Sequence, residues 1–179
     1  MRPWQKGFQS LLANPDGTGL SGKAVSEIIQ DISGKYWIAT EDGGTNIWDR
    51  QRSKITNLKH DASRNSLSVN NVHALLQDGD GIVWMGTFLC GLNRYDPEKD
   101  EFAIYKNVDS RSVGSNMVFS LHRDTDSNLW VGTPNGLCIF DSIQNAYIQY
   151  KPAQLGNRFV YDILPGKDNS LWICSFNDH

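Results

Sequence analysis

The chain lacks the features of membrane insertion, secretion targeting and a disulfide framework. No stretch approaches the roughly 20 apolar residues of a transmembrane helix, and the first residues, MRPWQKG, lack the apolar stretch of a secretion signal. The three cysteines, Cys90, Cys138 and Cys174, lie at unrelated spacings without a C-x-x-C pair. They fit neither an even disulfide set nor paired zinc ligands, so we interpret them as free thiols.

Positive charge is also sparse. The formal net charge is −3, and the densest basic cluster is Arg50, Arg52 and Lys54. Nucleic-acid binding requires a basic surface that neutralises phosphates, so we expect no nucleic-acid partner and interpret this cluster as a solvated hairpin turn. Sustained apolar residues at i, i+3, i+4 and i+7 are absent as well, which argues against helices.

A unit of about 46 residues repeats along the chain. Its equivalent tryptophans are spaced by 47, 46 and 42 residues: Trp37, Trp84, Trp130 and Trp172. Each unit contains short segments of alternating apolar and polar residues, rich in aromatic and β-branched side chains, which predict four strands. Four antiparallel strands in such a unit form one β-propeller blade. The sequence therefore predicts an all-β fold of four-stranded antiparallel β-propeller blades.

Acidic residues and glycines recur at the turn before each tryptophan. Asp31, Asp78 and Asp124 lie where the first strand of a unit turns into the second. An Asp side chain can accept hydrogen bonds from the amides of its own turn. Gly34 and Gly81, three residues further on, supply the positive φ that such hairpins need.

In the later units Ser127 and Asn169 replace that glycine. The repeated tryptophans are predicted to be core residues, because every unit has one and a large apolar ring can fill the gap between adjacent blades.

The register also predicts the blade boundaries. We expect blades over 24–60, 72–107 and 117–150, the first strands of a further blade over 159–176, and the outer strand of a preceding blade over 8–12. A propeller typically closes with four to eight blades, so the predicted ring is incomplete. Uncapped repeats expose apolar faces. We therefore expect either a parent protein that extends beyond both ends or two copies in one ring, and self-association of the chain.

The pattern D-x-x-G-x-x-W-x-G-T, followed by G-L-x-x-Y/F-D, resembles the two-component regulator propeller repeat. Asp78–Thr87 with Gly91–Asp96 carries it most fully, and Asp124–Thr133 with Gly136–Asp141 repeats it. The resemblance implies the periplasmic sensor region of a hybrid two-component histidine kinase or regulator of Bacteroidetes. It also implies a small-molecule or oligosaccharide ligand, and a parent chain with a membrane helix and a kinase.

Binding residues are expected where loops depart from the repeat. In a propeller the ligand face is usually formed by the loops that join second to third strands and fourth strands to the next blade, because loops vary on a fixed scaffold. Phe88 is the aromatic candidate on these loops. The polar candidates are Glu41, Asp42, Asn135, Asn71, Asn116 and Arg158.

Catalytic, metal and cofactor motifs are incomplete. The G-x-G-x-x-G match at Gly17–Gly22 is followed by a β-type run, whereas a dinucleotide site needs a helix there. The Asp-rich turns at Asp78–Asp80 and Asp124–Asn128 lack the Gly and Glu of a calcium loop. No histidine has a partner at metal-ligand spacing, and no G-x-S-x-G elbow appears.

We therefore predict no catalytic residue, metal or cofactor, and a ligand-sensing role. Two alternatives stay open: a stand-alone propeller that acts as a lectin-like or protein-binding scaffold, and a propeller-fold lyase.

Overall fold

The computed structural model describes residues 10–13, 18–106, 115–141, 144, 146–150, 152, 155 and 158–176. Within these residues the chain has strands and no helix, so the all-β prediction is confirmed and no helix could cross a membrane. The strands are β1 (Val25–Gln30), β2 (Tyr36–Thr40), β3 (Gly44–Asp49), β4 (Lys54–Leu58), β5 (Val72–Gln77), β6 (Val83–Thr87), β7 (Leu92–Asp96), β8 (Glu101–Tyr105), β9 (Ser120–Arg123), β10 (Leu129–Thr133), β11 (Gly136–Asp141), β12 (Ala146–Tyr150), β13 (Phe159–Pro165) and β14 (Leu171–Phe176).

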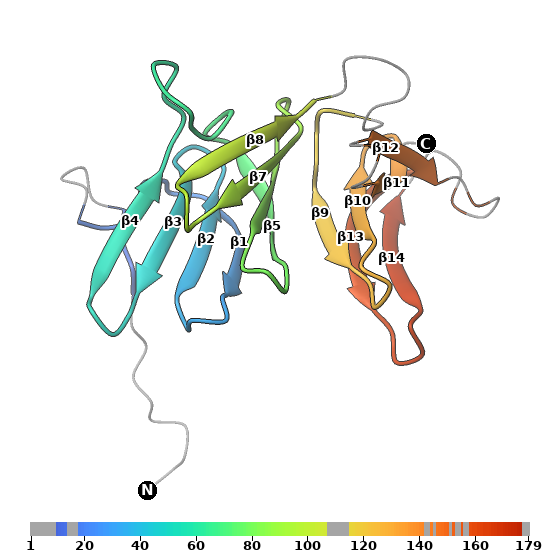
Figure 1. Cartoon of the computed structure of the whole chain (residues 1–179), viewed down its shortest axis with the longest axis horizontal. Helices are drawn as coiled ribbons and strands as arrows, with labels where there is room; N and C mark the ends of the chain where they lie inside the picture. Colours follow the sequence, from blue (N-terminus) through green and yellow to red (C-terminus); the bar gives the residue numbers. More distant parts are fainter. Residues whose placement is uncertain are drawn as a thin grey trace, which may run out of the picture.

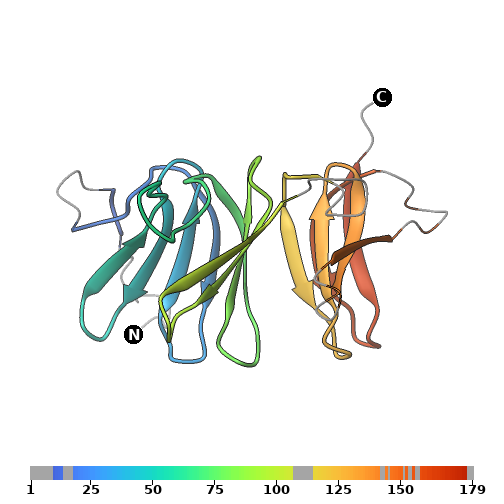
Figure 2. The ribbon, with the colours of Figure 1, turned by 45° about the horizontal axis from the view of Figure 1, so that its top comes forward.

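The strands form successive antiparallel meanders, each one blade. The first three blades are the four-stranded sheets β1–β4, β5–β8 and β9–β12, and the fourth is the two-stranded sheet β13–β14. The first strands of neighbouring blades contact one another in the order β1, β5, β9 and β13. The blades therefore stand side by side in an unclosed ring with these first strands innermost (Figures 1 and 2).

One carboxylate fixes both the turn and the tryptophan of each complete blade. In the first blade, Asp31 Oδ1 accepts the amides of Ser33 and Lys35, both at 2.9 Å, and Asp31 Oδ2 accepts the indole N–H of Trp37 at 2.8 Å. Burial opposes ionisation of Asp31, but the hydrogen bonds from Trp37 and the turn outweigh it and lower the pKa of Asp31. We name this arrangement the Asp–Trp latch.

The latch recurs in the next two blades. Trp84 Nε1 donates to Asp78 Oδ2 at 3.1 Å, and Trp130 Nε1 donates to Asp124 Oδ2 at 2.8 Å. The carboxylates again accept amides of their own turns. The predicted role of these aspartates in their turns is confirmed, and the indole bond was not foreseen.

The backbone of these turns has the positive φ that the sequence predicts at the glycine position. Gly34 and Gly81 have φ of 84° and 82°, and Ser127 and Asn169 adopt the same left-handed region with φ of 68° and 56°. Glycine pays no steric cost there, whereas serine does.

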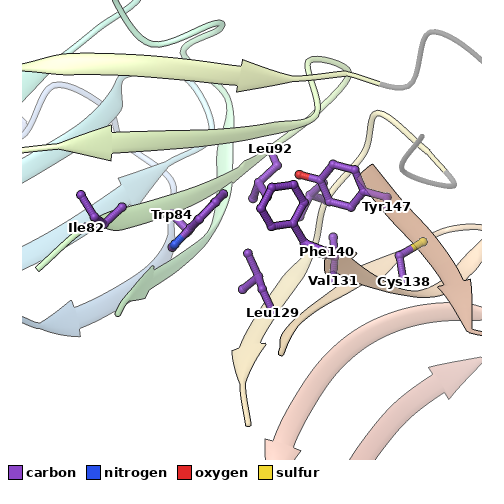
Figure 3. Packing of buried hydrophobic residues seen from close by; sticks show 9 residues of the cluster. Ile82, Trp84, Leu92, Leu129, Val131, Cys138, Phe140 and Tyr147 are labelled. Carbon is purple, nitrogen blue, oxygen red and sulfur yellow. The ribbon is translucent and has the colours of Figure 1, made fainter. Parts of the chain in front are cut away.

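The latched tryptophans pack against the third strand of the following blade. Trp37 lies 6.0 Å from the ring of Tyr95, and Trp84 lies 5.3 Å from the ring of Phe140. Figure 3 shows Trp84 directed from β6 toward Phe140 in the cluster that joins the second and third blades. Edge-to-face and tilted aromatic pairs of this kind add to the free energy of apolar burial.

Adjacent blades also approach closely where the second strand of one blade faces the first-strand region of the next. A Cβ placed on Gly86 would lie 2.5 Å from Cγ1 of Val118 in the next blade, and one on Gly132 would lie 2.8 Å from Cγ1 of Val160. The glycine of the W-x-G-T segment therefore allows close packing between neighbouring blades.

The fourth blade departs from the prediction. Gly166 occupies the place of the latch aspartate, and Trp172 is 72% exposed, so the expectation that Trp172 is a core residue is wrong. Trp37 and Trp84 are covered by the third strand of the next blade, whereas within the described residues the fourth blade has no third strand and no further blade follows it. Trp130 is accordingly only half-buried and packs on the small cluster of the fourth blade.

Two further expectations concern the start of the chain and the cysteines. In the part of 8–12 that the structure describes, residues 10–12, no strand is present, and Ala13 makes an isolated parallel bridge with Leu20. Residues 8 and 9 lie outside the described residues. Cys90, Cys138 and Cys174 form no disulfide among the described residues.

Breaking the latch should destabilise the protein. Asp78→Ala removes the acceptor of buried Trp84 Nε1 and of the turn amides. Because unsatisfied buried donors are costly, we expect a loss of about 2–3 kcal/mol in the free energy of unfolding. Asp80→Ala, in the same turn and exposed, is the matched control and should change it by less than about 0.5 kcal/mol in urea denaturation. Equal effects of the two variants would contradict the latch.

The free face of the fourth blade should cause self-association. Leu164 and Trp172 pair across β13 and β14 and are 55% and 72% exposed. Apolar patches of this kind favour association. We expect light scattering to show oligomers whose mass falls in Trp172→Ser, whereas Ile148→Ser on the outer strand β12 should have no effect. A monodisperse monomer at all concentrations would contradict this prediction.

Candidate functional site

Aromatic side chains from three blades gather beside the inner strands. His73 is the second residue of β5 and Tyr161 the third residue of β13, each directly after a valine, and Phe119 lies at the same repeat position immediately before β9. Phe88 follows β6, and the fourth blade adds Phe159 and Phe176. We name the set the aromatic row: His73, Phe88, Phe119, Phe159, Tyr161 and Phe176.

The rings of the aromatic row contact one another in sequence. His73 lies 5.8 Å from Phe88 and 4.9 Å from Phe119, measured between ring centroids. Phe119 lies 4.7 Å from Phe159 and 6.1 Å from Tyr161. Phe159 continues the row to Phe176 at 4.7 Å. The row therefore crosses two blade interfaces without a break.

A repeated irregularity of the first strand positions these rings. The pairing of β5 with β6 shifts register between Val72 and Ala74, which leaves His73 out of the ladder. The pairing of β13 with β14 shifts in the same way around Tyr161. A bulge of this type bends the strand and changes the direction of a side chain, and such bulges are common beside binding sites.

The row remains partly open to solvent. Tyr161 is 57% exposed and Phe176 is 46% exposed, whereas His73, Phe88 and Phe119 are half-buried. An apolar surface kept at the interface with water loses part of the free energy that complete burial would give. Contiguous exposed aromatic surface is typical of a binding site.

The first blade supplies polar groups where the others supply rings. Ser26 occupies the bulge position of His73, and its hydroxyl donates to the carbonyl of Val72 at 2.5 Å. Glu41, exposed after β2, occupies the repeat position of Phe88. Burial lowers the pKa of His73, and the nearby carboxylate of Glu41 opposes this shift. His73 is therefore neutral at neutral pH.

Asn71 adds a polar atom next to the aromatic row. Its carbonyl accepts the amide of Phe88 at 3.0 Å, which ties the loop before β5 to the loop after β6. Its side-chain Oδ1 is buried and has no hydrogen-bond partner in the structure. A buried acceptor without a partner is costly and is available to a donor from a ligand.

Glu27 is a half-buried carboxyl group of the inner strands. Its carboxylate accepts the amide of Leu75 from the second blade. Burial raises the pKa of Glu27 to about 7, against the effect of the Leu75 hydrogen bond, and the charge of Asp162 on β13 raises it further.

The structure relates three of the sequence candidates to the aromatic row: Phe88 belongs to it, Asn71 binds the Phe88 amide, and Glu41 acts on His73. The other candidates make contacts within loops. Asp42 Oδ1 accepts the amide of Lys23, the Asn116 carbonyl accepts the amide of Gly91, the Asn135 amide donates to Thr133 Oγ1, and the Arg158 amide donates to the Leu155 carbonyl.

Sequence reasoning missed most of the row: His73, Phe119, Phe159, Tyr161 and Phe176. A signal was nevertheless present. The residue at the bulge position of successive units changes from Ser26 to His73, Phe119 and Tyr161, while the preceding residue is always valine. In loops and bulges with a binding role, the residue type varies beside constant structural positions.

Two hollows lie away from the row. One, of about 390 Å³, lies between the first two blades and is lined by Trp37, Tyr95 and turn residues. The other, of about 480 Å³, is lined by Trp130, Tyr150 and Trp172 on the third and fourth blades. Within the described residues no group of three or more His, Cys, Asp or Glu side chains could hold a metal ion.

Comparison with known proteins agrees with this architecture. A family model described as "Two component regulator propeller" matches residues 66–88 and 112–135. These two segments of the chain are therefore similar to the two-component regulator propeller repeat. Each matched segment includes the latch turn of a blade and the tryptophan after it. No curated protein sequence matches the chain.

Solved structures share the propeller fold. The extracellular domain of the putative hybrid two component system BT3049 from B. thetaiotaomicron is 26% identical with a TM-score of 0.75, over 86% of this chain and 22% of that one. The extracellular domain of the putative one component system BT4673 from B. thetaiotaomicron is 20% identical with a TM-score of 0.67, over 84% of this chain and 20% of that one. Virginiamycin B lyase from Staphylococcus aureus is 18% identical with a TM-score of 0.68, over 92% of this chain and 51% of that one.

This chain thus spans about a fifth of the length of those two extracellular domains.

Glu27 should make the stability of this propeller depend on pH. The pKa of Glu27 is raised in the folded state from 4.5 to about 7. The favourable contribution of Glu27 to the free energy of unfolding is therefore complete below pH 4.5 and is lost as the pH rises to about 7. Glu27→Gln keeps an acceptor for the Leu75 amide and removes the charge. We expect Glu27→Gln to be more stable than the wild type by roughly 2 kcal/mol at pH 8, with a smaller gain at pH 4.5.

The measurement is urea denaturation across this pH range. Exposed Glu101→Gln serves as the control and should follow the wild type. A difference between Glu27→Gln and the wild type that does not change with pH would contradict the half-buried, proton-binding role.

Proposed function

We propose that this propeller is the ligand-sensing segment of a hybrid two-component sensor, outside the cytoplasm, and that it recognises an oligosaccharide at the aromatic row. The similarity to the two-component regulator propeller repeat supports the sensor role. The similarity to the extracellular domain of a putative hybrid two component system supports the location. The membrane helix and histidine kinase of such a sensor would belong to other parts of its parent chain.

The aromatic row is the observation that favours a sugar ligand. Sugar rings have apolar C–H faces and polar edges, and aromatic side chains bind such faces while nearby polar groups bind the hydroxyls. The row provides continuous faces from Phe88 to Phe176, and Asn71 Oδ1 and Glu41 provide acceptors beside it.

Signalling would follow from a difference in affinity between two states of the sensor. A ligand shifts an equilibrium only by the free energy with which it prefers one state. Because the row crosses the interfaces between the second, third and fourth blades, a ligand lying along it would favour one relative arrangement of these blades. We propose binding without turnover, although an enzyme, virginiamycin B lyase, has a similar fold.

The test is calorimetric titration of the protein with a panel of neutral and charged oligosaccharides. We expect binding that Tyr161→Ala weakens about tenfold or more, because an exposed ring that stacks on a sugar contributes roughly 1–2 kcal/mol. Ile104→Ala, at a similarly exposed position on β8, should leave affinity unchanged. Absence of binding to every sugar would count against the proposal, and turnover of a bound sugar would favour the lyase alternative.

A further inference from the structure

We infer that the first blade of one copy of this chain docks on the fourth blade of a second copy, so that copies associate head to tail. The two surfaces lie at opposite ends of the series of blades (Figure 1). The contact identifies what covers exposed Trp172, and it is independent of the proposed ligand because it does not use the aromatic row.

The fourth blade exposes the side chains with which the second blade contacts the third. Leu76 and Trp84 of the second blade pack in the cluster that joins it to the third, where Trp84 is buried. Leu164 and Trp172 occupy the same repeat positions in the fourth blade, and both are exposed. The fourth blade therefore presents one half of an interface between blades.

The first blade presents the other half. In the second blade, the surface that receives the first blade consists of buried residues on β5, β6 and β7: Val72, Leu75, Val83 and Tyr95. The first blade has an apolar residue at each of these repeat positions: Val25, Ile28, Tyr36 and Trp48. Of these, Val25 and Ile28 are exposed, and Tyr36 and Trp48 are half-buried with ring centroids 5.6 Å apart. No blade precedes β1 among the described residues, so a second copy can reach this surface.

An aromatic pair between blades has a counterpart on these two surfaces. In the interface between the first and second blades, Trp37 faces Tyr95 at 6.0 Å between ring centroids, and the next interface repeats the pair. Trp172 and Trp48 occupy the same two repeat positions on the fourth and first blades. Docking in the same register therefore places Trp172 of one copy against Trp48 of the other.

A polar contact between blades also has its two halves on these surfaces. Gln77 donates from Nε2 to a glycine carbonyl of its own turn, and its Oε1 accepts the Ile32 amide of the first blade at 2.8 Å. Gln30, at the same position of the first blade, donates to its own turn in the same way, at 3.2 Å. In the docked pair, Oε1 of Gln30 would accept the amide of Lys167, which occupies the repeat position of Ile32.

A contact between two fourth blades would use only part of these features. It would bury Leu164 and Trp172 but leave Ile28 and Trp48 exposed, and it would bring no turn amide to Gln30. The head-to-tail contact covers both surfaces. It is heterologous, because different surfaces of the two copies meet, and each copy carries one surface of each kind.

Cys174 limits how closely the second copy approaches. It occupies the repeat position of Gly86, where an added Cβ would lie 2.5 Å from Cγ1 of Val118 in the next blade. The thiol therefore holds the second copy further away than a neighbouring blade of the same chain. We expect association that is reversible and depends on protein concentration.

The experiment mixes two variants that each lack one surface. Trp172→Ser removes the ring of the fourth blade and Trp48→Ser removes the ring of the first, so we expect each variant alone to be monomeric in light scattering. An equimolar mixture keeps one complete contact and should form pairs with about twice the mass of the monomer. Ile104→Ser, an exposed position on β8, is the control and should associate as the wild type does.

Ile28→Ser tests the first blade without changing the Trp48 ring. It should also be monomeric, and it should pair with Trp172→Ser. Wild-type association in both Trp48→Ser and Ile28→Ser would overturn the head-to-tail contact. A mixture that stays monomeric while the wild type associates, or a wild type that is monomeric at all concentrations, would overturn it as well. The sugar titration decides the proposed function separately.

A designed disulfide tests the register of the contact. A Cβ on Gly132 would lie 2.8 Å from Cγ1 of Val160 in the next blade. Cys174 and Val25 occupy these two repeat positions. Val25→Cys should therefore form a covalent dimer with Cys174 of a second copy on mild oxidation, because a disulfide requires such proximity. Ile104→Cys should not, and an equal yield of covalent dimer from the wild type, through two Cys174 thiols, would overturn the register.

Discussion

The structure depends on the hydrogen bond between an aspartate of the first turn and the indole of the tryptophan that follows. The bond is 2.8 Å in the first and third blades and 3.1 Å in the second. The same carboxylate closes the turn, so a single side chain couples local backbone geometry to the orientation of the largest core residue. The oriented ring then forms the surface on which the third strand of the next blade packs, as Trp37 does with Tyr95.

The latch does not constrain which residues occupy the inner ends of the blades. Packing between blades is carried by the tryptophans and by close contacts at Gly86 and Gly132. The bulge positions beside them also contact the next blade, and they hold Ser26, His73 and Phe119 in successive blades. A repeated scaffold can therefore carry a row of contacting aromatic side chains at positions where its sequence varies.

The sequence predicted what is encoded locally. The alternation of residues gave the strands, and the repeat gave the turn positions, including the left-handed backbone of Asn169. It did not predict the exposure of Trp172, because burial of a latch tryptophan requires a neighbouring blade. It also missed Phe119 and Tyr161, because the direction of a side chain at a bulge and its proximity to another blade arise only from tertiary packing.

The position of the aromatic row has a consequence for how a bound ligand would act. His73, Phe119 and Phe159 belong to three blades, and their contacts span both interfaces between them. A ligand that contacts all of these rings binds most tightly in the arrangement of the three blades that brings the rings together. Its binding free energy is therefore coupled to that arrangement. Between the first two blades, Glu27 accepts the Leu75 amide with a half-buried carboxyl group whose pKa is raised by burial. Contacts along the row and packing between blades thus involve the same inner strands, which is the physical requirement of the proposed sensing role.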